Sequence, residues 1–172
     1  MFQIRQETVQ DNTAIRQIHE RAFGQSAEAD LVDRLRISCP DQISLVAVAG
    51  DQLVGHILFT PAKIEYTDGS KVSGIGLAPL AVLPEFQGKG VGSLLIQAGL
   101  DQLHELKQSF VIVLGHPGYY SRFGFEPAYR YQISCEFTGE NREAFMIYLL
   151  NHPAFQAKEG VARYHPDFSA FA

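Results

Sequence analysis

A glycine-containing loop between a strand pattern and a helix pattern most constrains the fold of this chain. Three glycines fall within residues 88–92, directly after an apolar stretch that ends at Leu83. Apolar residues then recur on one helical face as far as Leu106, and residues 109–114 form a short apolar run typical of a buried strand. Strand, loop, helix and strand make a βαβ unit, so the two strands run parallel with a right-handed crossover. The loop therefore lies at the C-terminal ends of the strands, where α/β sheets bind ligands.

Antiparallel strands and two further helices are predicted around this unit. Two apolar runs flank Gly50-Asp51, which predicts a hairpin over residues 44–59. Glycine and proline within residues 71–83 predict an irregular strand, with a bulge or a place where another molecule approaches the backbone. The other expected elements are a strand at residues 2–5, a helix from Asp11 or Asn12, a helix that begins after Ser26 and ends before Cys39, and a strand or short buried helix at residues 144–150.

Composition and charge limit the class of protein. The 172 residues are 46% hydrophobic and 19% charged, which suits one globular domain over residues 1–172, with a core of about 2–127 and a C-terminal elaboration of about 128–172. The net charge of −5 disfavours nucleic acid or an anionic membrane as partner. Cys39 and Cys135 match no metal-ligand spacing and indicate buried thiols of a reducing compartment, so no metal is expected. Since the N-terminus has no signal-peptide core and no apolar run approaches about 18 residues, we expect a cytoplasmic protein.

The loop itself has the properties of an anion-binding site. It leads into the first turn of a helix, where unpaired N–H groups and the helix dipole favour a negative charge. Its glycines give phosphate oxygens access to the backbone, and Lys89 adds a positive charge. The spacing of Gly88, Gly90 and Gly92 matches neither the P-loop pattern nor the dinucleotide fingerprint. A phosphate-containing ligand of another type is therefore expected.

Two spaced motifs resemble those of a known family. Gln87, Gly90 and Gly92 form Q-x-x-G-x-G after a strand, which resembles the acetyl-CoA signature of the GNAT superfamily of N-acetyltransferases. Residues 119–125 resemble the later Y-x-x-x-G-F element of that family, and the order of strands and helices agrees over about residues 2–127. The resemblance implies an α/β fold with a mixed, mostly antiparallel sheet, in which a central parallel βαβ unit splays apart to admit acetyl-CoA.

The resemblance also implies which residues bind the cosubstrate acetyl-CoA. Main-chain N–H groups of the loop would hold the pyrophosphate, and the preceding strand would run beside the pantetheine with the Val82 N–H facing the acetyl carbonyl. The strands would splay apart near Leu83 and Leu114. The implied cofactor-binding residues are Leu80, Ala81, Val82, Gln87, Gly88, Lys89, Gly90, Val91, Gly92 and Ser93.

The other expected site residues transfer protons. Attack of an amine on a thioester needs a proton acceptor for the ammonium and a proton donor for the departing thiolate. Tyr120 is the expected donor because a phenol is protonated at neutral pH, and Tyr119 is the alternative. No acidic residue lies within residues 73–80, where many relatives have a glutamate, so a water chain is the expected proton acceptor. His116 either contacts this water or forms a local hydrogen bond in its loop.

Three further features have more than one interpretation. His56 lies within an apolar strand pattern and is expected to be a hydrogen-bonded core histidine rather than a catalytic one. Arg122 suits a phosphate or a substrate carboxylate as well as the surface of a short helical turn. One interpretation of the tail at residues 163–168 is that it packs over the acceptor side of the cofactor cleft. The alternatives are that its aromatic residues belong to the ordinary core or to an interface.

These observations predict an enzyme that transfers acetyl from acetyl-CoA to a primary amine of a small molecule or peptide. Direct attack is expected, without a metal or a covalent enzyme intermediate, because neither cysteine lies in the loop. The alternative is a CoA-responsive binding module without turnover, and a third hypothesis is a domain that binds nucleotide phosphates. The acceptor is not specified by any motif, and homodimerisation is left open.

Overall fold

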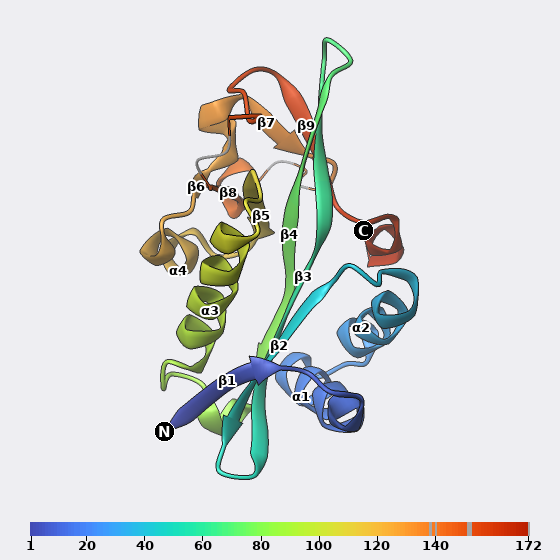
Figure 1. The fold of residues 1–172 in the computed structure, drawn as a ribbon, viewed down its shortest axis with the longest axis vertical. Coiled ribbons are helices and arrows are strands. Elements are labelled where there is room, and N and C mark those ends of the chain that lie inside the picture. The colour runs from blue at the N-terminus through green and yellow to red at the C-terminus, as the bar shows by residue number, and fades with distance from the viewer. Residues whose placement is uncertain (138, 140, 151–152, 172) are drawn as a thin grey trace. The chain divides into compact units, whose positions relative to one another are not determined.

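The computed structural model describes residues 1–137, 139, 141–150 and 153–171 (Figure 1). These residues group into two compact units. The first unit consists of residues 1–59, 78–101 and 167–171, and the second of residues 60–77 and 102–166 apart from the positions not described. The prediction of a core at about 2–127 followed by a C-terminal elaboration stays a prediction.

In the first unit, antiparallel strands form where the apolar runs and the turn between them predict a hairpin. Strand β1 (Phe2–Gln6) pairs with β2 (Ile43–Ala49), and β2 pairs with the first part of β3 (Gln52–Tyr66). The turn between β2 and β3 places Gly50 at φ 61°, a left-handed conformation that glycine adopts without a steric penalty. The predicted hairpin is confirmed.

Two helices of the first unit form with a buried apolar face, and neither N-cap residue, Asp11 for the first or Ser26 for the second, makes a side-chain capping hydrogen bond. Helix α1 (Asn12–Phe23) buries Ile15 and Ile18, and helix α2 (Ala27–Ser38) buries Leu31, Val32 and Leu35. A short 3-10 helix (Val9–Asp11) precedes α1, and the Asp11 carboxylate accepts the Thr8 N–H at 2.7 Å. Arg5 also donates to this carboxylate, and with the Thr8 hydrogen bond it lowers the pKa of Asp11 to about 2 against the cost of burial. Both predicted helices are confirmed.

Helix α3 (Val91–Glu105) begins in the first unit and is the helix of the predicted βαβ unit. A 3-10 helix (Pro84–Phe86) separates it from β4 (Lys71–Val82). Leu95, Ile96 and Leu100 of α3 are buried. A Cβ atom on Gly99 would lie 2.2 Å from the Phe59 ring, so this helix position requires glycine to admit the ring.

In the second unit, the first part of β4 pairs in parallel with β5 (Phe110–Leu114), with Ile75 opposite Val111 and Gly76 opposite Ile112. This unit also contains antiparallel β5 with β8 (Phe145–Leu149), antiparallel β6 (Glu126–Pro127) with β8, parallel β7 (Ile133–Cys135) with β9 (Gly160–Arg163), and antiparallel β9 with β3, and β3 is hydrogen-bonded to β4 as well. The sheet is thus mixed and mostly antiparallel, and the parallel strands of the βαβ unit are confirmed. The strand alternative for residues 144–150 is also confirmed.

Short helices make up much of the remaining second unit. They are α4 (Pro117–Tyr120) and 3-10 helices at Ser121–Phe123, Ala128–Tyr131 and Arg142–Ala144, and a further 3-10 helix (Pro166–Phe171) continues into the first unit. Over the described ranges, no helix has both the length and the apolar character needed to cross a membrane.

The glycines of β4 admit aromatic rings of the same chain. A Cβ atom on Gly74 would lie 2.4 Å from the Phe110 ring, and one on Gly76 would lie 2.6 Å from the Tyr164 ring. The sequence suggests a bulge or the approach of another molecule at this strand. In the structure, intramolecular ring packing against the glycines of this strand is one physical reason for them.

Candidate active site

The loop before α3 lies in the first unit and presents an open backbone surface. Gly88 and Gly90 have φ values of 75° and 87°, and nothing lies within 4 Å of a Cβ atom built on either residue. Residues 87–90 are exposed, and the Gly90 carbonyl accepts the Leu94 N–H at 3.1 Å to begin the helix. The arrangement brings exposed backbone and the N-terminal end of the α3 dipole to one place, as an anion site requires.

Side-chain contacts fix the conformation of this loop. The Gln87 side-chain amide donates to the Val82 carbonyl at 3.0 Å, which joins the loop to the end of β4. Arg21 of α1 forms a two-point ion pair with Glu85, with the shorter contact at 2.8 Å. The Lys89 ammonium lies 5.4 Å from the centre of the Phe86 ring. Sequence reasoning placed Gln87 in the loop but missed this hydrogen bond, which assigns its side chain a role in holding the loop.

The residues before the loop form the end of β4. Ala81 is buried, whereas Leu80 and Val82 are partly exposed. A Cβ atom on Gly55 of β3 would lie 2.9 Å from Val91 and 3.4 Å from the Ala81 carbonyl oxygen, so glycine there lets α3 pack closely. Gly55 was not singled out in the sequence, because its requirement depends on packing between distant segments.

His116 and Tyr120 lie in the second unit, immediately after β5. The structure therefore brings the cofactor-binding candidates 87–93 together in the first unit and the two proton-transfer candidates together in the second. His116 is exposed and caps α4, because its Nδ1 atom accepts the Gly118 N–H at 3.2 Å. The local hydrogen bond considered for His116 is therefore present, and it uses Nδ1 rather than Nε2.

Tyr120 is enclosed by aromatic rings and by a glycine. Its side chain is 9% exposed, and a Cβ atom on Gly115 would lie 2.3 Å from its ring. The ring centres of Tyr119 and Phe125 lie 5.1 and 5.7 Å from that of Tyr120. Burial, and then the neighbouring Tyr119, raise the pKa of Tyr120 above its ordinary value, so the phenol is protonated at neutral pH. Tyr119 is more exposed and packs against Arg122, whose guanidinium lies 5.4 Å from its ring centre.

A second buried tyrosine, Tyr164, was not identified as a site residue in the sequence. It follows β9, fills the space above Gly76 and packs 6.2 Å from the Phe137 ring centre. Burial raises the pKa of the Tyr164 hydroxyl well above its ordinary range, with smaller contributions from Cys135 and Tyr120. The sequence analysis singled out the tail at residues 163–168 and Gly76 but did not connect them, because Tyr164 lies 88 positions after Gly76 (164 − 76); the burial of Tyr164 and Phe168 fits the core alternative for this tail.

The first unit contains a buried chain of polar side chains. Ser44 Oγ donates to Glu7 Oε1 and lies 2.7 Å from His56 Nε2, and His56 Nδ1 lies 2.8 Å from His19 Nε2. His56 and His19 are both 0% exposed. Because both nitrogens of His56 have partners, the interpretation of His56 as a hydrogen-bonded core histidine is confirmed.

We call Glu7, Ser44, His56 and His19 the polar chain. Its electrostatics favour a charged carboxylate at Glu7 and neutral imidazoles at His56 and His19. Burial opposes ionisation of Glu7, but the His56 imidazole, whose Nε2 lies 3.7 Å from Glu7 Oε1, and hydrogen bonds from Arg36 and Ser44 outweigh it and lower the pKa of Glu7 to about 2. Burial lowers the pKa of His19 to about 3 and also lowers the pKa of His56. The two histidines are therefore uncharged at neutral pH.

Metal-binding side chains do not gather anywhere in the described part of the chain. Among those residues, no three or more histidine, cysteine, aspartate or glutamate side chains form a group that could hold an ion. Cys39 and Cys135 are both buried, in agreement with the interpretation as buried thiols.

The comparisons with known proteins agree with the geometry of the loop and sheet. The family described as "Acetyltransferase (GNAT) domain" matches residues 3–128. The chain belongs to the GNAT acetyltransferase family. Its relatives include the Escherichia coli K12 protein named "Uncharacterized N-acetyltransferase YhbS", 35% identical over 169 residues, which cover 98% of this chain and 99% of that protein. The E. coli K12 protein named "Uncharacterized N-acetyltransferase YjhQ" is 48% identical over 119 residues, which cover 68% of this chain and 65% of that protein.

Solved structures of other GNAT proteins have the same fold. E. coli YhbS in complex with CoA has a TM-score of 0.87 at 34% identity, covering 99% of this chain and 93% of that one. A GNAT acetyltransferase from Brucella melitensis in complex with acetyl-CoA has a TM-score of 0.78 at 34% identity, covering 98% of both chains. The predicted GNAT fold is confirmed, and so is the prediction that the chain is an N-acetyltransferase.

Proposed function

We propose that this GNAT protein transfers an acetyl group from acetyl-CoA to a primary amine of a small molecule or peptide by direct attack. The observation that carries the proposal is the exposed loop at the N-terminus of α3, with Gly88 and Gly90 in left-handed conformations and open space above both. The related proteins from E. coli and B. melitensis, crystallised with CoA and acetyl-CoA, support acetyl-CoA as cosubstrate.

In this proposal the loop and the end of β4 bind the two halves of the cosubstrate. Backbone N–H groups of residues 87–93 hold the pyrophosphate at the positive end of the α3 dipole, and Lys89 adds charge. The partly exposed Leu80 and Val82 run beside the pantetheine, and the Val82 N–H faces the acetyl carbonyl. The Gln87 side chain acts indirectly, because its hydrogen bond to Val82 keeps the loop against the strand.

The chemical step is a transfer between two nucleophiles. The neutral amine nitrogen attacks the thioester carbonyl, and a C–N bond forms while the carbonyl oxygen becomes an oxyanion. The C–S bond then breaks as the oxyanion collapses, and the CoA thiolate takes the proton of the Tyr120 hydroxyl. Because burial favours the protonated phenol, Tyr120 is suited to donate and to recover a proton.

The amine loses its protons to water rather than to a carboxylate on the strand before the loop. Residues 73–80 contain no acidic side chain. His116 is exposed, and with Nδ1 occupied by the cap of α4 its Nε2 atom is the nitrogen placed to contact this water. A location in the cytoplasm and a possible homodimer stay predictions from the sequence.

Calorimetric titration with acetyl-CoA, together with a thiol-release assay on a panel of amines, amino acids and peptides, tests this function. Binding with thiol release is the expected result. Binding of acetyl-CoA without thiol release on any acceptor would favour a CoA-responsive module. Binding of ATP or NAD without binding of CoA would favour a nucleotide-phosphate site. Acetyl-enzyme trapped after denaturation would contradict direct attack.

A matched pair of glycine variants separates binding from folding in this test. Gly90 and Gly50 both have positive φ, at 87° and 61°, and both have open space around a Cβ atom. Gly90→Ala and Gly50→Ala should therefore each lower the free energy of unfolding by roughly 1 kcal/mol. Only Gly90→Ala should weaken acetyl-CoA binding, by roughly tenfold, because Gly50 lies in the β2–β3 turn. Equal affinities of the two variants would remove the loop from the cofactor site.

A further inference from the structure

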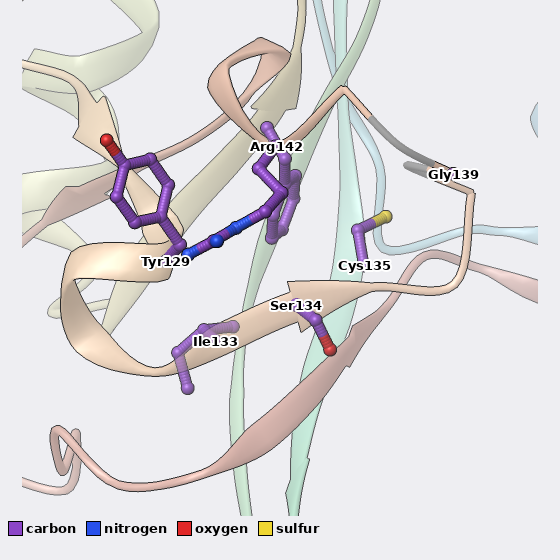
Figure 2. Close-up of a pocket in the computed structure, with 7 residues that line it drawn as sticks. Tyr129, Ile133, Ser134, Cys135, Gly139 and Arg142 are labelled. Atoms are coloured by element: carbon purple, nitrogen blue, oxygen red, sulfur yellow. The ribbon is translucent and has the colours of Figure 1, made fainter.

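A cavity of about 250 Å³ lies within the second unit (Figure 2). Its lining residues all follow residue 128, where the match to the GNAT family ends. The lining residues are Tyr129, Ile133, Ser134, Cys135, Gly139, Arg142 and Phe145. The site is therefore a feature of the C-terminal segment of this chain rather than of the matched family core.

The walls of the cavity are mostly apolar. Ile133 and Cys135 extend from β7, Phe145 begins β8, and all three side chains are buried. The volume is slightly below the usual range of small-molecule pockets, which begins at roughly 300 Å³. It suits one branched aliphatic or aromatic group.

One cationic side chain, Arg142, accompanies these apolar walls. Its guanidinium lies 4.4 Å from the centre of the Tyr129 ring, and Figure 2 shows the two side chains next to each other. Across the ranges that the structure describes, Arg142 takes part in no ion pair. Glu143 is engaged instead by the Tyr129 hydroxyl, which donates to it at 2.8 Å. A guanidinium packed on a ring keeps its N–H groups directed outward, where a carboxylate can accept two of them.

Contacts within the second unit connect this cavity with Tyr120. Cys135 of the cavity wall lies opposite Ala162 of β9, two positions before Tyr164. The Tyr164 ring fills the space at Gly76 of β4, which lies opposite Ile112 of β5. The Tyr120 ring fills the space at Gly115, the residue just after β5. Burial, and then Cys135 and Tyr120, raise the pKa of the Tyr164 hydroxyl, so both residues lie near it. The cavity and the proposed proton donor are thus neighbours of the same side chain.

We propose that this cavity is an acceptor subsite, which takes the apolar side chain of a small α-amino acid while Arg142 binds its carboxylate. The inference rests on the proposed acetyltransferase function and names the acceptor class. An apolar amino acid presents three groups, and the cavity and Arg142 accommodate two of them. The α-amine is the group left for acetylation, and the product is an N-acetylated amino acid.

Acceptor pairs that differ only in the carboxylate test the role of Arg142. We would measure kcat/KM for leucine against leucinamide and for phenylalanine against phenylalaninamide. The free acids should be preferred, and Arg142→Gln should lower kcat/KM for them by roughly 10- to 100-fold while changing the amides little. Arg142→Lys should restore part of the loss, because it retains the charge without the planar fork.

Two further variants control for charge and for volume. Arg130→Gln removes another exposed arginine of the same unit that does not line the cavity, and it should leave the preference unchanged. Ser134→Leu adds volume at an exposed lining position, and it should reduce kcat/KM for phenylalanine more than for alanine. Equal rates for acids and amides in the unaltered protein, or an equal effect of Arg142→Gln and Arg130→Gln, would overturn the subsite.

Binding measurements distinguish failure of this inference from failure of the proposed function. N-acetylleucine and N-acetylleucinamide are titrated into the protein by calorimetry in the presence of CoA, which needs no turnover. Arg142-dependent binding of the acid alone, with no transfer to any amine, would support the carboxylate subsite and reject the enzyme. Transfer to amines without any binding of N-acetylleucine would reject the subsite and keep the enzyme.

Discussion

The first unit buries a connected set of polar side chains, whereas the second unit surrounds two hydroxyls with aromatic rings and glycines. In the first, Ser44 links Glu7 to His56, and His56 links Ser44 to His19. In the second, Tyr120 lies against Gly115 between two other aromatic rings, and Tyr164 lies against Gly76. Both clusters are removed from water, yet their surroundings differ.

The difference shows two ways in which burial controls protonation. Along the polar chain, burial keeps the two imidazoles neutral while the hydrogen bonds on Glu7 keep that carboxylate charged. Such a paired network contributes to the stability and uniqueness of the fold. Around the tyrosines, burial raises the pKa of both phenols, so each retains its proton. We therefore expect changes in the polar chain to alter stability first, and changes at Tyr120 to alter turnover first.

The largest expected effect is on the rate of acetyl transfer by Tyr120→Phe. Removal of a general acid typically lowers kcat by roughly 10²- to 10⁴-fold. The substitution retains the ring that packs on Gly115, so the free energy of unfolding should change by less than about 1 kcal/mol. Steady-state kinetics, calorimetric titration with acetyl-CoA and urea unfolding check the three quantities, and acetyl-CoA affinity should remain close to that of the unaltered protein.

Tyr119→Phe is the matched control for that prediction. It removes the hydroxyl of the adjacent, more exposed tyrosine and should change kcat by less than about threefold. If Tyr119→Phe abolished turnover and Tyr120→Phe did not, the proton donor would be Tyr119. If Tyr120→Phe lost acetyl-CoA affinity at an unchanged rate per bound complex, neither donor assignment would stand.

The contrast between the two clusters also explains which parts of the site could be predicted from the sequence. The βαβ unit and the loop at residues 87–93 were predictable because strand, loop and helix signals follow one another locally. The Y-x-x-x-G-F element directed attention to Tyr120 in the same way. His56 was correctly interpreted as a core histidine because it interrupts an otherwise apolar strand pattern.

Features that depend on distant pairs could not be predicted. His19 and His56 are 37 positions apart, and nothing in the pattern of α1 indicates that they meet. The requirement for glycine at position 76 depends on Tyr164, which follows a short strand in the C-terminal segment. The cavity at Arg142 is built from four short elements without a motif, so only the folded chain reveals it.

The second prediction breaks the polar chain at its centre. His56→Ala removes both hydrogen bonds of this fully buried side chain and leaves a cavity, so the free energy of unfolding should fall by about 3 kcal/mol. Denaturant unfolding measures the loss, with His104→Ala as the control because His104 is exposed. The folded fraction of His56→Ala should still bind acetyl-CoA. A loss below about 1 kcal/mol would show that the polar chain does not stabilise the first unit.

The smallest expected effect is a pH dependence near neutrality that the two buried histidines of the first unit should produce. The pKa of His19 is about 3 in the folded chain and 6.5 ordinarily, and the pKa of His56 is lowered too, so the unfolded chain binds more protons below about pH 6.5. The stability from these neutral histidines is therefore present above that pH and is lost as the pH falls, by about 0.7 kcal/mol from His19 between about pH 7 and pH 6, and His56 adds to the loss in the same direction. Glu7, with a pKa of about 2 against an ordinary 4.5, adds a loss in the same direction only at lower pH. Urea unfolding measures the slope, and the double variant His19→Leu/His56→Leu should flatten it. An unaltered slope in the double variant would assign the pH dependence to other groups and remove the electrostatic contrast between the two units.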